Sequence, residues 1–188
     1  MGDFILVTGG ARSGKSRFAE LLAGCSGLPV TYIATAQILD KEMAERVEKH
    51  RQSRPAEWDL IEEPFKIEKA LLDLKDSQGI ILLDCVTVWL SNLLLAGTPD
   101  QEILTQVGKA AQAAVGIGPK VIFVTNEVGQ GIVPDNPLAR KYRDLAGWAN
   151  QILAGAAAAV YYVVAGYPLE VKQQGQQILD SLRSQKNL

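Results

Sequence analysis

The chain has 188 residues, of which 47% are hydrophobic and 21% charged, and its formal net charge is −2. This length and composition fit one globular domain and exclude a disordered chain. Without a basic excess we expect no nucleic-acid partner, and two cysteines exclude a disulfide framework.

Six short apolar runs alternate with helical patterns along the chain. We expect strands at 4–8, 30–34, 58–62, 79–84, 120–125 and 160–165, and helices at 15–24, 39–53, 65–75, 86–96, 100–115 and 137–158. Several runs are continuously apolar, which is typical of parallel strands buried on both faces. The alternation predicts a three-layer α/β fold, a mostly parallel sheet flanked by helices. We expect one domain over residues 1–172, and a polar tail or docking helix over 173–188.

The longest apolar stretch, "ILAGAAAAVYYVVAG", covers about 15 residues, which is too short for a membrane span. The N-terminus lacks a basic region followed by an apolar segment and a cleavage site, so we expect no signal peptide and a cytoplasmic protein.

Cysteine and tryptophan side chains are expected to serve packing. We expect Cys25 and Cys85 to be small buried apolar residues rather than reactive thiols. We expect Trp58, Trp89 and Trp148 to lie in the core or at a subunit interface.

The string "GGARSGKS" follows the first apolar run and precedes a helical pattern. It meets the motif G-x-x-x-x-G-K-[ST] at Gly9, Gly14, Lys15 and Ser16. Glycines let backbone N–H groups turn inward around phosphate at a helix N-terminus. Lys15 is expected to reach the β- and γ-phosphates, and the Ser16 hydroxyl to ligate Mg²⁺. The sequence therefore predicts a nucleoside triphosphate site.

A partner acid is expected at the end of another buried strand. The run "GIILLD" supplies Asp84, which either contacts Mg²⁺ or the nucleotide, or caps the following helix. The string "NEVGQGIVP" also follows a strand end, where α/β proteins bind ligands, and we expect it at the rim of the active site. A purely structural loop is the alternative.

A regulatory GTPase is not indicated, because Glu127 stands where the guanine-reading motif needs lysine, and no D-x-x-G follows the acid. A small-molecule kinase, with Arg12, Arg140 and Arg143 as phosphate clamps, and an oligomeric ATPase both remain open. A nucleotide-sensing module without turnover is a further alternative.

The single histidine, His50, lies in the most positively charged part of the chain, with Arg46, Lys49, Arg51 and Arg54 around it. One interpretation is a solvated basic helix end. The other is covalent catalysis, because a neutral imidazole can attack phosphorus and form a phosphoramidate.

Five strings carry a resemblance to a known family: "ILVTGGARSGKSRFAE", "YIATAQILDKEMAERVEKHRQSRPAEW", "LLDCVTVWLSNLL", "VTNEVGQGIVPDNPLARKYRDLAGWANQ" and "VVAGYPLEVK". From about residue 4 to 172 the chain resembles the bifunctional adenosylcobinamide kinase/adenosylcobinamide-phosphate guanylyltransferases of cobalamin biosynthesis. The phosphate-loop motif is shared by many families, whereas "RPAEW" after His-Arg and "NEVGxGIVP" are far more specific.

The resemblance implies a RecA-like P-loop fold, a homotrimer, and two reactions. Adenosylcobinamide is phosphorylated by GTP or ATP, and GMP then passes from GTP to that phosphate through a GMP-histidine intermediate. His50 matches the family's nucleophile, and Lys49 occupies the place of a second histidine found in some relatives. Asp84 replaces a glutamate of some relatives. The implied nucleotide contacts are Gly9, Gly10, Ala11, Arg12, Ser13, Gly14, Lys15, Ser16, Ala34, Thr35, Ala36, Arg51, Gln52, Ser53, Arg54, Glu62 and Asp84, with Mg²⁺ at Ser16 and Asp84.

Overall fold

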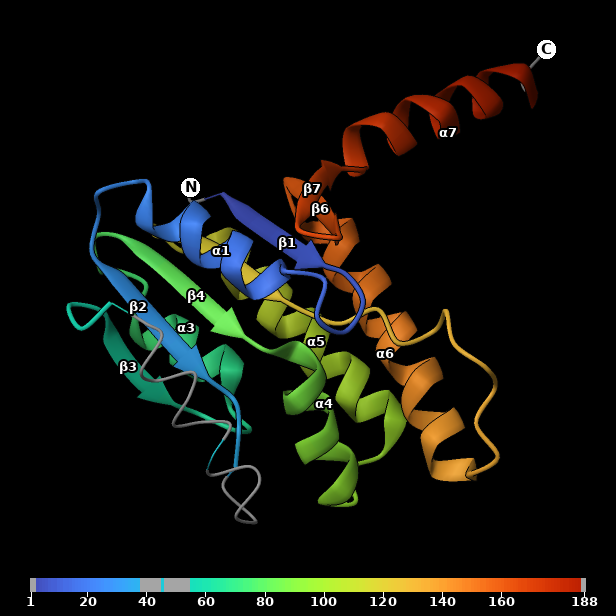
Figure 1. The fold of residues 1–188 in the computed structure, drawn as a ribbon, viewed down its shortest axis with the longest axis horizontal. Coiled ribbons are helices and arrows are strands. Elements are labelled where there is room, and N and C mark those ends of the chain that lie inside the picture. Colours follow the sequence, from blue (N-terminus) through green and yellow to red (C-terminus); the bar gives the residue numbers. More distant parts are fainter. Residues whose placement is uncertain (1–2, 38–44, 46–54, 187–188) are drawn as a thin grey trace.

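The computed structural model describes residues 3–37, 45 and 55–186 (Figure 1). Its sheet has the strand order β3-β2-β4-β5-β1-β6-β7, and every neighbouring pair is parallel except β6 and β7. The strands are β1 (Phe4–Thr8), β2 (Val30–Ala34), β3 (Asp59–Glu62), β4 (Ile80–Asp84), β5 (Lys120–Val124), β6 (Ala159–Val164) and β7 (Tyr167–Glu170). The helices are α1 (Lys15–Gly24), α3 (Ile67–Asp73), α4 (Val86–Leu95), α5 (Asp100–Gly116), α6 (Pro137–Ala156) and α7 (Lys172–Lys186).

The central strands are apolar over most of their length because both faces of the sheet are covered. In β1, Phe4 and Leu6 pack into a core shared with α3, α4, α5 and α6. Ile5 and Val7 point to the opposite face, where they join a second core with Ala19 of α1. Successive side chains of a strand point to opposite faces, so one continuous apolar run serves both cores. The expected three-layer α/β fold is confirmed.

The long helix α6 begins where its sequence provides a start signal. The Asn136 side chain accepts hydrogen bonds from the N–H groups of Leu138 and Ala139, and Pro137 stands at the first helical position. Such a cap satisfies backbone donors that have no partner within the helix. This start fixes the length of the loop between β5, which ends at Val124, and α6.

Six expected strands and five expected helices lie where the sequence places them, to within about two residues. The expected helix 39–53 lies outside the described residues apart from Glu45, which is helical. The short strand β7 was not predicted. It pairs antiparallel with β6 through a tight turn in which Ala165 and Gly166 have φ of 50° and 86°. After it, α7 projects away from the sheet (Figure 1).

The expectation that both cysteines are buried is wrong for Cys25, and Cys85 is only partly buried by its neighbours. Cys25 caps the C-terminal end of α1 and is exposed, because the chain leaves the helix there for a surface turn. Among the tryptophans, Trp89 is fully buried, whereas Trp148 is 50% exposed. Within the described part of the chain, no helix combines the length and the hydropathy that a membrane crossing requires.

The turn after β1 lies tightly against β6. A Cβ atom at Gly9 would lie 2.4 Å from the backbone oxygen of Val163 and 2.7 Å from Ser13 Oγ. The Val163 oxygen belongs to β6, whose backbone is paired with β1 on one side and β7 on the other, so it cannot easily move aside. By contrast, a Cβ at Gly10 would meet nothing within 4 Å. Only glycine at position 9 therefore allows this approach.

We expect Gly9→Ala to lower the free energy of unfolding of the nucleotide-free protein by about 1–3 kcal/mol, the usual cost of overpacking. Gly10→Ala is the matched control and should change it by less than about 0.5 kcal/mol. Denaturant unfolding of both variants measures the difference. Equal stabilities would show that the turn is not packed against β6 as described.

Candidate active site

Four strand ends meet at one edge of the sheet. Asp84, the last residue of β4, is paired with Ala34 of β2 on one side and with Val124 of β5 on the other. Val124 is in turn paired with Val7 of β1. Because parallel strands all run the same way, the segments that follow them emerge side by side. The sheet therefore brings together residues more than 75 positions apart in the sequence.

The phosphate-binding loop spans residues 9–16, between β1 and α1. Gly14 lies just before α1 with φ of 94°, and Arg12 has φ of 57°. Their left-handed backbone conformation reverses the direction of the chain within a few residues, so that α1 starts at Lys15. The helix N-terminus and the loop amides then face the same edge as Asp84, which is the arrangement that binds phosphate.

Lys15 crosses this loop and is only 8% exposed. Its Nζ donates to the Gly10 carbonyl at 3.1 Å. Burial lowers the pKa of Lys15, while the negative charge of Asp84 acts in the opposite direction. A buried ammonium close to a carboxylate interacts strongly with a triphosphate, because little water screens it.

Two hydroxyl groups of the loop region are buried without a hydrogen-bond partner. They are Thr8 Oγ1, at the end of β1, and Ser13 Oγ, inside the loop. Buried polar groups in proteins are normally satisfied, and an orphan points to a missing ligand or water. Both orphans therefore support ligand binding at this loop.

A pair of hydrogen bonds holds the end of β4 to the end of β2. Thr35 Oγ1 accepts from the Cys85 N–H at 3.0 Å and donates to the Cys85 carbonyl at 2.8 Å. Asn92 of α4 donates to the Thr35 carbonyl at 2.8 Å. Thr35 is completely buried, so its hydroxyl is already bonded within the protein. Its effect at this edge is to fix the backbone that carries Asp84.

The thiol of Cys85 lies beside Thr87 Oγ1, at 3.1 Å. Burial, with the nearby charge of Asp84, raises the pKa of Cys85 to about 11. A thiol with this pKa is almost entirely protonated at neutral pH, and the thiolate is the reactive form. Cys85 is therefore a structural residue, as the sequence indicated.

A second set of polar contacts ties the end of β5 to α4 and α6. Asn126 donates to Thr87 Oγ1 at 3.0 Å, and Asn150 of α6 donates to the Asn126 carbonyl at 3.1 Å. Tyr142 of α6 donates its hydroxyl to the Thr87 carbonyl at 2.8 Å, and burial raises the pKa of Tyr142 to about 12. These contacts fix where the chain leaves β5.

The structure places part of the expected site together. The loop residues 9–16, Ala34, Thr35, Ala36 and Asp84 all lie at the aligned edge. Glu62 also ends a strand, but β3 is the outermost strand on its side, so Glu62 lies apart from the loop. His50, Arg51, Gln52, Ser53 and Arg54 lie outside the described residues.

Two of the three arginines considered as phosphate clamps have other partners. Arg140 donates to the carbonyls of Pro134 and Asp135, at 2.9 and 2.7 Å, within the loop between β5 and α6. Arg143 lies 3.9 Å from the carboxylate of its neighbour Asp144. Arg12 is exposed on the phosphate-binding loop itself.

Sequence reasoning missed several residues that support the site. The turn between β6 and β7 packs against the phosphate-binding loop, where Gly166 donates its N–H to the Ser13 carbonyl at 2.8 Å. Asn92 and Thr87 were also missed. The available signal was a polar residue within an otherwise apolar helical pattern, "VTVWLSNLLL".

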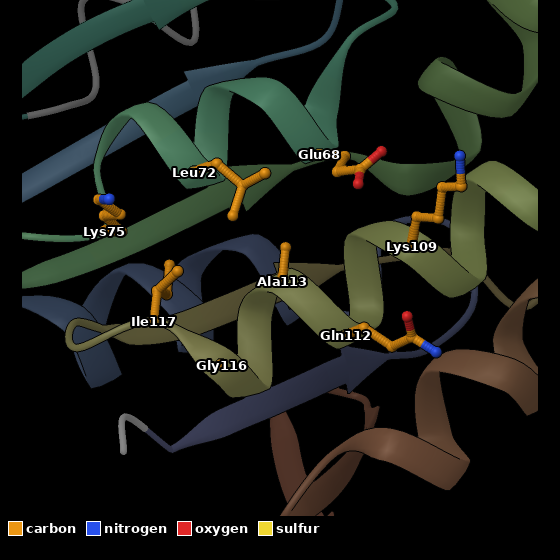
Figure 2. Close-up of a pocket in the computed structure, with 8 residues that line it drawn as sticks. All are labelled: Glu68, Leu72, Lys75, Lys109, Gln112, Ala113, Gly116 and Ile117. Carbon is orange, nitrogen blue, oxygen red and sulfur yellow. The ribbon is translucent and has the colours of Figure 1, made fainter.

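A shallow groove of about 330 Å³ lies between α3 and α5, away from the aligned edge. Figure 2 shows Leu72 and Ala113 in its middle, with Ile117 towards one end and Glu68 and Lys109 towards the other. No buried polar side chain points into it. This groove therefore has no feature of a catalytic site and provides residues for control variants.

Comparison with solved structures supports the fold. The chain resembles the structure titled "Crystal structure of the RadB recombinase" with a TM-score of 0.52 and 15% sequence identity, over 86% of this chain and 74% of that one. This likeness establishes a RecA-like fold, as the sequence predicted, and nothing about activity.

Curated relatives are similar along almost their whole length. The chain is 45% identical to the bifunctional adenosylcobalamin biosynthesis protein CobP of Pseudomonas aeruginosa over 168 residues, which is 89% of this chain and 96% of that protein. It is 46% identical to the bifunctional adenosylcobalamin biosynthesis protein CobU of Escherichia coli, and 44% identical to that of Salmonella typhimurium. Both alignments cover 89% of this chain and 99% of the relative.

The model of the family described as "Cobinamide kinase / cobinamide phosphate guanyltransferase" matches residues 5–171, which include the phosphate-binding loop, Asp84 and the loop between β5 and α6. The predicted resemblance is thereby confirmed, and the chain belongs to the cobinamide kinase/cobinamide phosphate guanyltransferase family.

Proposed function

We propose that this protein phosphorylates adenosylcobinamide with GTP or ATP, and then transfers GMP from GTP to adenosylcobinamide phosphate. The observation that carries the proposal is the family match over residues 5–171, combined with a phosphate-binding loop whose buried Lys15 faces Asp84. The protein is expected to act in the cytoplasm, where nucleoside triphosphates are available. A kinase of another small alcohol, without covalent catalysis, is the alternative that the experiments below distinguish.

Binding of the triphosphate depends on the loop. The backbone amides of residues 9–16 and the N-terminus of α1 hold the phosphates, and Lys15 adds a poorly hydrated positive charge beside them. The two orphan hydroxyls, Thr8 Oγ1 and Ser13 Oγ, are further groups available to the ligand or to an ordered water. Together they orient the triphosphate along the carboxyl edge of the sheet.

Mg²⁺ suits this set of residues. Among the described residues no group of three or more His, Cys, Asp or Glu forms a metal cluster. A P-loop Mg²⁺ does not need such a cluster, because it takes one or two protein ligands and completes its shell with phosphates and water. Ser16 and Asp84 are the residues that would hold it, and the ion would neutralise charge that develops on the phosphates.

The transfer of GMP is proposed to pass through His50. An imidazole nitrogen attacks the α-phosphorus of GTP, a P–N bond forms, and the bond to the β-phosphate breaks as pyrophosphate leaves. The phosphate of adenosylcobinamide phosphate then attacks the same phosphorus and releases the imidazole. The basic residues near His50 in the sequence, Arg51 and Arg54, support the transfer by balancing phosphate charge.

We expect His50→Ala to abolish covalent labelling by GTP that carries the label in its α-phosphate, because no other imidazole exists in the chain. Phosphorylation of adenosylcobinamide should continue, since it needs no covalent intermediate. Mass spectrometry of the labelled protein and a nucleoside-diphosphate assay measure the two. Lys49→Ala is the neighbouring control and should still be labelled. A labelled His50→Ala protein would exclude this histidine as the nucleophile.

We expect Lys15→Ala to lower both activities by about 10²–10³-fold, as is usual when a preorganised hydrogen-bond donor to the phosphates is removed. Lys109→Ala, in the groove between α3 and α5, is the matched control and should leave both rates unchanged. Steady-state kinetics of both steps test this expectation. Normal rates in Lys15→Ala would mean that the loop is not the shared triphosphate site.

We further infer a homotrimer, the assembly that the resemblance implied. Exposed apolar side chains gather on the hairpin and the last helix: Val164, Tyr167, Leu169, Ile178, Leu179 and Leu182. A monomer leaves them in water, and large exposed apolar patches usually mark interfaces. Sedimentation equilibrium should give three times the chain mass of 20.3 kDa. A monomer at micromolar concentration would contradict the inference.

A further inference from the structure

The segment after β5 is bonded directly to the phosphate-binding loop. The N–H of Glu127 donates to the carbonyl of Gly9 at 3.0 Å. Two residues earlier, the N–H of Thr125 donates to the carbonyl of Val7 at 2.9 Å. Because β5 lies between β1 and β4, this segment emerges between the loop and Asp84. Figure 1 shows the chain running from β5 past the loop before it turns into α6. Glu127 therefore stands next to the triphosphate site.

The carboxylate of Glu127 is held in place by its own loop. Oε1 accepts a hydrogen bond from the N–H of Gly129 at 2.7 Å. A Cβ at Gly129 would lie 2.9 Å from that oxygen, so the carboxylate lies close against the backbone of its own loop. Among the described residues no cation forms an ion pair with Glu127, and no donor contacts Oε2. One oxygen thus fixes the group while the other is available as an acceptor.

Other carboxylates at this edge have different positions or partners. Asp84 interacts with Lys15. Glu63 accepts two backbone N–H groups just before α3. Glu62 ends β3, four strands from β1, which at about 4.8 Å per strand amounts to about 19 Å. Glu127 follows β5, the strand next to β1, and so lies beside the loop. Among the described residues, its carboxylate contacts only the N–H of Gly129.

We propose that Glu127 is the general base of the kinase step, an inference that rests on the function proposed above. The hydroxyl oxygen of the acceptor attacks the γ-phosphorus and a new O–P bond forms. The bond from the γ-phosphorus to its bridging oxygen breaks, and its electron pair leaves with the nucleoside diphosphate. The hydroxyl proton passes to the carboxylate of Glu127. A carboxylate within hydrogen-bond reach of the hydroxyl both orients it and takes its proton.

The second step has no need of this base. Its acceptor is a phosphate, which already carries negative charge at neutral pH because its second pKa lies near 6. No proton has to be removed before it attacks. The two activities of one site should therefore respond differently to the loss of a single carboxylate. A residue that merely supported the phosphate-binding loop would affect both steps together.

The test is Glu127→Gln, which keeps the shape and the hydrogen bond to Gly129 but removes the basic oxygen. We expect kcat for adenosylcobinamide phosphorylation to fall by about 10²–10⁴-fold, with little change in KM. Covalent labelling by GTP, and GMP transfer to adenosylcobinamide phosphate supplied ready-made, should stay at wild-type rates. Glu127→Asp should recover part of the kinase rate. Asp135→Asn, an exposed acid of the same loop, is the control and should match wild type.

Three outcomes distinguish a failure of the role proposed for Glu127 from a failure of the proposed function. Wild-type protein that does not phosphorylate adenosylcobinamide would refute the proposed function itself. Active wild type with an equally active Glu127→Gln variant would overturn the role of Glu127 alone. Loss of both steps in Glu127→Gln, with a lower melting temperature and no recovery in Glu127→Asp, would show a supporting residue and likewise overturn the proposal.

Discussion

The parallel pairing of β2, β4, β5 and β1 in one register is the constraint on which the site depends. Ala34, Asp84, Val124 and Val7 lie in one row across the sheet, so the four chains leave it at the same edge. A slip of one residue in any pair would turn every side chain of that strand to the opposite face. Both faces are buried, so such a slip would also exchange the two cores. Packing of the cores thereby fixes the alignment of the catalytic edge.

Side chains behind that edge convert the alignment into a rigid frame. Thr35 joins β2 to the residue after Asp84, and Asn92 joins the same point to α4. Thr87 and Asn126 do the same for β5. Each of these polar groups is at least partly buried and has a hydrogen-bond partner. A fully satisfied buried network of this kind favours one structural arrangement over the alternatives. The frame holds Asp84 and the start of the loop after β5 in place.

This frame suggests how one site serves two acceptors. In the proposed function, the triphosphate is held by elements that both reactions share, namely the loop of residues 9–16 and Lys15. The groups proposed to differ between the reactions follow two of the aligned strands in the sequence. His50 belongs to the segment after β2, and Glu127 to the segment after β5. An alcohol needs a base and a phosphate does not, so the acceptor itself determines which attached segment is chemically required.

Much of the fold was predictable from the sequence because the local patterns are strong. Short apolar runs, several of them continuous, marked the six parallel strands, and the glycine-rich motif predicted a phosphate-binding loop at the turn that the structure places between β1 and α1. The strand β7 was missed, since Tyr167–Glu170 is short, contains proline and owes its pairing to a turn at Ala165 and Gly166. Cys25 was misjudged because composition alone does not tell that the chain turns outward at the end of α1.

The sequence by itself therefore determined the elements, the phosphate-binding motif and the family. Only the tertiary structure decided the strand order, which does not follow the order of the chain, and with it the neighbours of the phosphate-binding loop. Three contacts join segments far apart in the sequence: the close approach of Val163 to Gly9, the hydrogen bond from Glu127 to Gly9, and the two hydrogen bonds between Thr35 and Cys85. Such contacts arise from the packing of strands into one sheet, which no local pattern encodes.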